Sequence, residues 1–351
     1  MLAMNAESKS EYRFYRPTII VAAPRSGSTL LFETMRHSRS LWTIGDESHM
    51  VFEHLKKLDP RYGICSSNRL VASDADDETV ERIREVFFEH LRDSSDRPYG
   101  ELDSDTAPAP RFLEKTPKNS LRIPFLNEVF PDARYIYLFR DPRENLSSII
   151  EAWRSSDFVT YSGLPGWPGQ WSFLLPPGFE HLWGTSLEEV VAFQWRAANQ
   201  FILDDLRAIP ADRWTAVSYA ELITDTTATI RRLCEFADIP FDEDLREHCN
   251  RQLPLSRYTK TDPKNGKWRR NEIIIEQVMS DLRPVIERIA VDVSPYTSSP
   301  VLTTGPIRDG AVVAQPPRMG RNETCYCGSQ LRYKHCHGNV HATNGVTGLT
   351  Q

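Results

Sequence analysis

Apolar residues fall into two kinds of pattern along the chain. Three short runs rich in β-branched and aromatic residues, at residues 18–23, 134–139 and 214–219, predict buried strands. Stretches with helical spacing separate or follow these runs, at residues 29–38, 121–130, 144–153, 187–209, 219–237 and 272–289. Strands that alternate with helices form βαβ units, which build a parallel sheet. The pattern therefore predicts an α/β fold in which helices cover both faces of a parallel sheet.

One segment, residues 157–183, breaks this alternation. It is rich in proline, glycine and aromatic residues and carries almost no charge. A loop of this length without secondary structure of its own is uncommon in a compact domain. Two interpretations stay open: the segment packs as a cover over the core, or it forms an aromatic lid around a substrate.

Composition narrows the classes of function. The 351 residues are 40% hydrophobic, and Lys+Arg 42 against Asp+Glu 48 gives a formal net charge of -6. Such a chain has no overall basic field to gather nucleic acid or anionic membranes, so any anion site must be local. The first residues lack the apolar stretch of a signal peptide, and no apolar run reaches the ~18 residues that a membrane helix needs. We expect a soluble, cytoplasmic protein without nucleic-acid or membrane partners.

A candidate anion-binding loop lies where the first predicted strand passes into a helix. Its residues are Arg25, Ser26, Gly27, Ser28 and Thr29. A helix N-terminus presents unbonded N–H groups and a partial positive charge, so this loop can wrap a phosphate or sulfate while the arginine supplies a full charge. The loop is not a Walker A motif, which needs a second glycine followed by Lys and then Ser or Thr.

A second candidate anion element follows the predicted strand that ends at Phe139. Arg140 comes directly after the strand, and Ser148 lies eight residues later, about two helical turns away. Between them, Asp141 suits a helix N-cap and Pro142 suits the first helical turn. Arg140 and Ser148 are placed to hold one phosphate from two sides. The alternative is a structural ion pair for Arg140 and a solvated helix position for Ser148.

Three segments, PRSGSTLL, FLEKTPKNS and YIYLFRDPRENLSSI, together resemble the sulfotransferases that use 3′-phosphoadenosine 5′-phosphosulfate (PAPS), especially the bacterial and tyrosylprotein-type branch. The resemblance spans residues 18–288 approximately and implies a P-loop-like parallel sheet flanked by helices. It also implies that residues 25–29 hold the 5′-phosphosulfate, whereas Arg140 and Ser148 hold the 3′-phosphate.

The same resemblance implies roles for residues elsewhere in the chain. Glu47 takes the position of the general base. Lys115 takes the position of a lysine near the oxygen that bridges sulfur and phosphorus in PAPS. There, together with Arg25, it neutralises the departing nucleotide, adenosine 3′,5′-diphosphate (PAP). Lys267 and Arg269, in the segment GKWRR, lie where the family has a basic loop over the nucleotide, although this segment is alternatively a solvated basic turn. His49 is a rival base because imidazole titrates near neutral pH.

The resemblance thus implies transfer of the sulfonyl group from PAPS to a hydroxyl of a small molecule or peptide, by in-line displacement with a carboxylate base. The aromatic segment favours an acceptor with an apolar or phenolic body. Two alternatives stay open. One is a nucleotide-dependent phosphoryl transferase on a P-loop-like scaffold, and the other is a non-catalytic nucleotide-binding adaptor that acts through its C-terminal tail.

The tail contains four metal-ligand residues in the arrangement C-x-C-x8-C-H. They are Cys325, Cys327, Cys336 and His337, a set that tetrahedral Zn²⁺ accepts, with His335 as an alternative ligand. Four protein ligands leave no open position for water, so we expect a structural zinc ion. The surrounding residues closely resemble the SEC-C motif.

The chain thus divides into three parts. We expect a sulfotransferase domain at residues 15–290, a linker rich in Pro, Ser, Thr and Gly at residues 291–318, and a zinc module at residues 319–339. The module is locally basic and resembles appended recognition elements, so we expect it to dock a protein partner.

Overall fold

A five-stranded parallel sheet forms the centre of the molecule in the part of the chain that the computed structural model describes. That part comprises residues 12–62, 66–102, 108–165, 167–251, 266–303, 305–307, 322–323 and 332. The strands lie in the order β2-β3-β1-β4-β7, and every neighbouring pair is parallel. Their bounds are β1 Thr18–Val21, β2 Leu41–Trp42, β3 Arg111–Lys115, β4 Arg134–Phe139 and β7 Trp214–Ser218.

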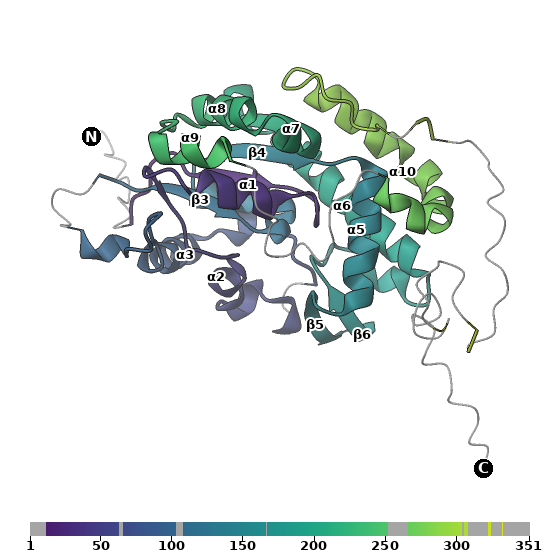
Figure 1. The fold of residues 1–351 in the computed structure, drawn as a ribbon. Helices are drawn as coiled ribbons and strands as arrows, with labels where there is room; N and C mark the ends of the chain where they lie inside the picture. The colour runs from purple at the N-terminus through teal and green to yellow at the C-terminus, as the bar shows by residue number, and fades with distance from the viewer. Residues whose placement is uncertain are drawn as a thin grey trace, which may run out of the picture.

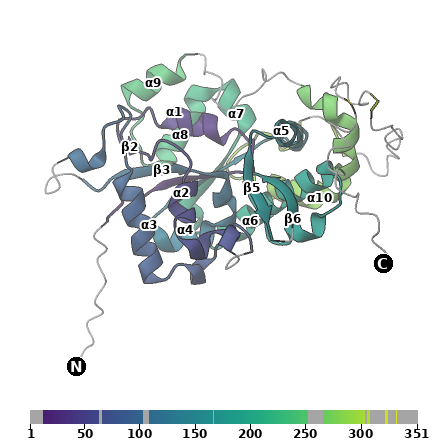
Figure 2. The ribbon, with the colours of Figure 1, turned by 90° about the horizontal axis from the view of Figure 1, so that it is seen from below.

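Helices cover both faces of this sheet, as Figures 1 and 2 show. One face carries α1 Ser28–Met35, α7 Tyr219–Thr224, α8 Thr226–Ala237 and α9 Glu243–Cys249. The other carries α2 His49–Glu53, α3 Asp77–Glu89, α4 Ile123–Val129, α5 Pro142–Ser155, α6 Leu187–Leu206 and α10 Glu272–Val293.

Alternation along the strands explains the two layers. In β1, Ile19 and Val21 belong to one buried cluster, whereas Ile20 belongs to the other. Successive side chains of a strand point to opposite faces, so a strand that is buried on both sides reads as a continuous apolar run. The prediction of an α/β fold with a helix-covered parallel sheet is confirmed.

The three predicted strands are present, but sequence reasoning missed β3, whose sequence RFLEK ends in two charged residues. Both are buried: Glu114 is 0% exposed and Lys115 is 1% exposed. Glu114 Oε1 accepts hydrogen bonds from Ser48, Thr116 and Asn119, and these donors compensate a buried carboxyl group. Burial itself raises the pKa of Glu114.

The predicted helix at residues 219–237 is two helices. A new N-cap at Asp225, whose side chain accepts from the Ala228 N–H, starts α8 directly after α7 ends at Thr224. Because an aspartate can cap a helix as readily as it can lie within one, the apolar spacing alone did not reveal the break.

The segment at residues 157–183 contains a two-stranded antiparallel sheet, so its description as a long loop was wrong. Strands β5 Val159–Leu164 and β6 Trp167–Ser172 pair with each other. Inside the hairpin, Trp167 and Trp171 pack at a ring separation of 4.9 Å, in a separate apolar cluster with Tyr161 and Phe179. In Figure 1 the hairpin lies beside α5. The aromatic residues therefore form a packed cover over α5 and α6.

No helix among the described residues combines the length and the apolarity needed to cross a lipid bilayer.

Candidate functional site

The sequence-predicted site residues of the domain gather at the carboxyl edge of the parallel sheet. The anion loop follows β1, Arg140 follows β4, Lys115 ends β3, and Glu47 follows β2. Ligands of open α/β sheets bind at this edge, because loops from neighbouring strands converge there.

Gly27 forms the sharp turn of the anion loop. It is the N-cap of α1 with φ 102°, and because glycine has no side chain, the helix has no side-chain cap. The first N–H groups of a helix have no intrahelical acceptor, so an anion can take the place of the missing cap. A β-carbon on Gly27 would lie only 2.4 Å from Tyr219 Cδ2, which means that the loop packs tightly against the first residue of α7.

The two anion elements face each other. Arg25 Nε lies 3.4 Å from Ser148 Oγ, to which it donates, and Arg140 Nη1 donates to the Arg25 carbonyl oxygen at 3.1 Å. Burial, together with the charge of Arg140, lowers the pKa of Arg25. Two half-buried guanidinium groups and a hydroxyl thus converge in one region of positive charge, as an anionic ligand requires.

Aromatic and amide groups fix this arrangement. The Arg25 guanidinium lies 4.8 Å from the Phe158 ring centroid, and that of Arg140 lies 4.7 Å from the Tyr219 ring. Ser26 Oγ donates to Asn145 Oδ1 on α5 at 3.0 Å, and Asn145 Nδ2 donates to the Pro24 carbonyl at 2.8 Å. Asn145 therefore ties the loop after β1 to the helix after β4, a role that no sequence signal had assigned to it.

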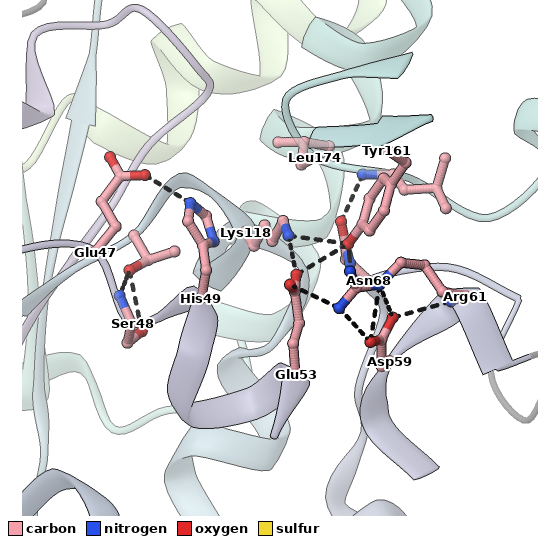
Figure 3. A network of polar contacts seen from close by, with 12 residues as sticks. Glu47, Ser48, His49, Glu53, Asp59, Arg61, Asn68, Lys118, Tyr161 and Leu174 are labelled. Atoms are coloured by element: carbon pink, nitrogen blue, oxygen red, sulfur yellow. Dashed lines mark hydrogen bonds and ion pairs between the residues drawn. The ribbon is translucent and has the colours of Figure 1, made fainter. Parts of the chain in front are cut away.

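Lys115 joins Glu47 to Thr29, the last residue of the anion loop. Lys115 Nζ donates to Glu47 Oε1 at 2.5 Å and to Thr29 Oγ1 at 3.2 Å. His49 Nε2 donates to the second carboxylate oxygen, Glu47 Oε2, at 2.8 Å (Figure 3). Burial alone would raise the pKa of Glu47, but the hydrogen bond from His49 and the charge of Lys115 lower it to about 2. The carboxylate is consequently ionised near neutral pH and held between two donors.

A buried polar network holds α2, the helix that begins with His49. Its members are Glu53 at the end of α2, Lys118, Tyr161 of the hairpin and Asn68 (Figure 3). Lys118 Nζ forms an ion pair with Glu53 and donates to Tyr161 Oη at 2.9 Å, and Asn68 Nδ2 donates to the same oxygen at 2.6 Å. Burial lowers the pKa of Lys118 to about 8, although the charge of Glu53 opposes the shift.

This network was not predicted, although Lys118 stands in the segment FLEKTPKNS. It anchors the hairpin to the helix beside the candidate base. Through Tyr161 the hairpin is thereby joined to Glu53, at the other end of the helix that begins with His49.

The basic segment after Gly266 is a short 3-10 helix at Lys267–Asn271. Lys267 pairs with Glu151 of α5 at 3.5 Å, and Arg269 pairs with Glu272 at 3.6 Å. The Gly266 N–H donates to Glu144 Oε1 at 3.1 Å, and Glu144 Oε2 lies 3.6 Å from Arg140. The segment is therefore joined to the Arg140 region through Glu144, while Lys267 and Arg269 contact carboxylates in this state.

The four candidate zinc ligands, Cys325, Cys327, Cys336 and His337, lie outside the described residues. Within the described residues, no group of three or more His, Cys, Asp or Glu side chains is arranged to hold a metal ion.

Comparisons with known proteins give two family matches. A family model described as "Sulfotransferase family" matches residues 17–243, more than half of the chain, and one described as "SEC-C motif" matches residues 321–339. The protein-tyrosine sulfotransferase A of Caenorhabditis elegans is 26% identical over 252 residues, which are 70% of this chain and 56% of the relative. The chain thus spans about half the length of that relative.

The tail has its own similarity. The protein translocase subunit SecA of Borreliella burgdorferi (strain ZS7) is 63% identical over 27 residues, which are 8% of this chain and 3% of SecA. Among solved structures, the sulfotransferase domain from the curacin biosynthetic pathway aligns at 18% identity with a TM-score of 0.46, over 81% of this chain and 99% of that domain.

Proposed function

Because the chain belongs to the sulfotransferase family, we propose that it transfers the sulfonyl group of PAPS to a hydroxyl group of an acceptor. The observation that carries the proposal is the contact between the two anion elements, in which Arg25 donates to Ser148 and Arg140 donates to the Arg25 carbonyl. One ligand with two separated anionic groups can engage both elements at once, and PAPS carries a phosphosulfate on the 5′ carbon and a phosphate on the 3′ carbon.

The donors present fit such a nucleotide. The N–H groups at the start of α1 and the Arg25 guanidinium suit the 5′-phosphosulfate. Arg140 and Ser148 suit the 3′-phosphate, and the segment with Lys267 and Arg269 borders that position through Gly266. In this proposal the two basic side chains exchange their present carboxylate partners for the nucleotide.

The transfer itself assigns a role to each group around Glu47. The acceptor oxygen forms a bond to sulfur while the bond between sulfur and the 5′-phosphate oxygen breaks, and the electron pair of that bond leaves with PAP. Glu47 accepts the hydroxyl proton, His49 holds the carboxylate through Nε2, and Lys115 with Arg25 stabilises the charge that develops on the departing phosphate.

Lys115 links the two halves of this reaction. A carboxylate with a pKa of about 2 is a weak base. In the proposed complex, Lys115 turns from Glu47 toward the departing oxygen, which removes a stabilising charge from the carboxylate. The pKa of Glu47 then rises, so the base becomes stronger when the sulfonyl donor is in place.

The acceptor is proposed to contact exposed apolar side chains as it reaches Glu47. Met50, next to His49 on α2, is 57% exposed, and Trp183, which contacts Trp167 of the hairpin, is 46% exposed. Such side chains favour a hydroxyl carried by an apolar or phenolic body, in a small molecule or a peptide.

A radiolabel assay with PAPS and a panel of hydroxyl acceptors tests the function. We expect Glu47→Gln to retain PAP binding and to lose turnover by roughly 10² or more. Glu89→Gln, an exposed position on α3, is the matched control. Full turnover in Glu47→Gln together with loss of turnover in His49→Asn would assign the role of proton acceptor to His49 instead. If the wild type transfers label to none of the acceptors and does not bind PAP, the proposal is refuted.

We also propose that the tail binds a structural Zn²⁺ ion through Cys325, Cys327, Cys336 and His337, and that the folded tail docks a protein partner. The family match at residues 321–339 supports the motif. The test is metal content by mass spectrometry: we expect one zinc per chain and its loss in Cys327→Ser. Undiminished zinc in that variant would exclude Cys327 as a ligand.

A further inference from the structure

The segment that leads toward the tail is attached to the helix of the candidate nucleotide site. After α10 ends at Val293, Val301 is only 5% exposed and belongs to the main apolar cluster, against which Leu302 and Ile307 also pack. The described part of the expected linker is thus bound to the domain.

Two hydrogen bonds from one residue fix this segment to the start of α5. The Thr303 backbone N–H donates to Asp141 Oδ2 at 2.8 Å, and Thr303 Oγ1 donates to the same oxygen at 2.7 Å. The other oxygen, Asp141 Oδ1, caps α5 by accepting from the N–H groups of Arg143 and Glu144. One carboxylate therefore joins the segment to the helix N-terminus, with charge-assisted bonds on both oxygens.

Arg143 provides a second attachment. Its side chain, which is 2% exposed, donates to the carbonyl oxygens of Gly305 at 3.1 Å and Pro306 at 3.2 Å, and it pairs with Glu276 of α10. Its guanidinium also lies 5.5 Å from the ring of Trp268, in the basic segment. The attachment thus reaches the start of α5, α10 and the segment over the proposed nucleotide.

The position of the attachment matters because α5 carries the proposed 3′-phosphate site. Arg140 directly precedes Asp141, and Ser148 follows on the same helix. The distance between the Arg140 and Ser148 donors depends on where α5 begins and on how its first turn is oriented. A group that fixes Asp141 also fixes the backbone of the neighbouring Arg140.

We propose that Thr303, through Asp141, is a positioning residue for recognition of the 3′-phosphate, and that the described residues around it, 301–303 and 305–307, are part of the nucleotide site. The inference rests on the proposed function. Thr303 touches no reacting atom; it raises the fraction of molecules in which Arg140 and Ser148 are aligned before the nucleotide arrives. The apparent affinity falls in proportion to that fraction.

Two nucleotides separate positioning from a general effect on the fold. PAP carries the 3′-phosphate, whereas adenosine 5′-phosphate lacks it but engages the remainder of the site. Calorimetric binding of both is measured with the full-length wild type and with Thr303→Val, which loses the hydroxyl donor but keeps the backbone N–H. We expect PAP binding to weaken about three- to tenfold and adenosine 5′-phosphate binding to change less than about twofold.

Two further variants are controls. Thr303→Ser keeps the hydroxyl and should restore PAP binding to the wild-type value. Thr297→Val removes a hydroxyl that accepts a local hydrogen bond from the Ser299 N–H, and it should leave both affinities unchanged. Thermal unfolding without nucleotide establishes that all variants are folded.

Equal weakening of both nucleotides in Thr303→Val, or no weakening of either, overturns the inference while leaving the proposed function intact. A wild type that does not prefer PAP to adenosine 5′-phosphate overturns both.

Discussion

Replacing Gly27 by alanine should both lower the free energy of unfolding and weaken nucleotide binding, because the added methyl group displaces the ring of Tyr219. Gly27 has φ 102°, where a residue with a β-carbon is strained by roughly 1–2 kcal/mol. The added carbon would lie 2.4 Å from Tyr219 Cδ2 and 2.7 Å from Cε2, against the 3.4 Å at which ordinary contact begins, so the ring must move by about 1 Å. Overpacking of this kind adds roughly 1–3 kcal/mol. The sum predicts a loss of roughly 2–5 kcal/mol in the free energy of unfolding.

The same movement should reach Arg140, because its guanidinium lies 4.7 Å from the Tyr219 ring centroid. Displacement by this amount of the arginine proposed to hold the 3′-phosphate should weaken PAP binding by roughly tenfold or more. Urea denaturation measures the first effect and calorimetry with PAP measures the second.

Gly184→Ala is the matched control for this substitution. Gly184 has φ 84°, but a β-carbon there meets nothing within 4 Å, so only the backbone strain applies. The reasoning is refuted if Gly27→Ala costs no more stability than Gly184→Ala and binds PAP as tightly as the wild type.

Three other predictions follow from the site. Arg140→Ala should weaken PAP binding by roughly 10- to 100-fold and leave adenosine 5′-phosphate binding nearly unchanged, as titration calorimetry can determine; equal loss for both would remove Arg140 from the 3′-phosphate site. Tyr161→Phe removes the hydroxyl to which Lys118 and Asn68 both donate, and it should lower the free energy of unfolding by roughly 1–3 kcal/mol. Ser162→Ala, at an exposed hairpin position, should leave it unchanged. Identical urea denaturation curves for wild type and Tyr161→Phe would contradict the network. The pKa of Glu47 is about 2 in the folded state, against an ordinary value of 4.5, so its ionisation stabilises the fold above pH 4.5, and this contribution is lost as the pH falls from 4.5 toward 2. A stability difference between wild type and Glu47→Gln that stays constant over this range would show that the carboxylate is not so stabilised.

Local chemistry made part of this architecture predictable. Strands β1, β4 and β7 are apolar on both faces, so their sequences report burial directly. Asp141 and Pro142 carry the signals of a helix start, and Asp141 caps α5 as predicted. The meeting of Arg25 with Ser148 also accords with the sequence, because elements that follow neighbouring parallel strands must share one edge of the sheet.

Long-range partners made the rest unpredictable. β3 was missed because its last two residues, Glu114 and Lys115, are charged. The hydrogen-bond donors that compensate Glu114 come from Ser48, Thr116 and Asn119, and the first of these is 66 residues away along the chain. Tyr161 and Lys118 are 43 residues apart, and neither sits in a pattern that names the other. The attachment of Thr303 to Asp141 spans 162 residues and joins a proline- and threonine-rich stretch to a helix cap. Such stretches are typical of free linkers, and only the tertiary fold reveals the contact.

The place where the chain leaves the domain has a spatial consequence for the SEC-C motif. Ile307 is held against the core, and the motif begins at residue 321. Even a fully extended connection of about 14 residues reaches no farther than roughly 50 Å. A macromolecule captured by the motif would therefore be confined to within that distance of Ile307, at an effective concentration of about millimolar order. The tail would then act as a short tether that keeps the bound macromolecule close to the domain.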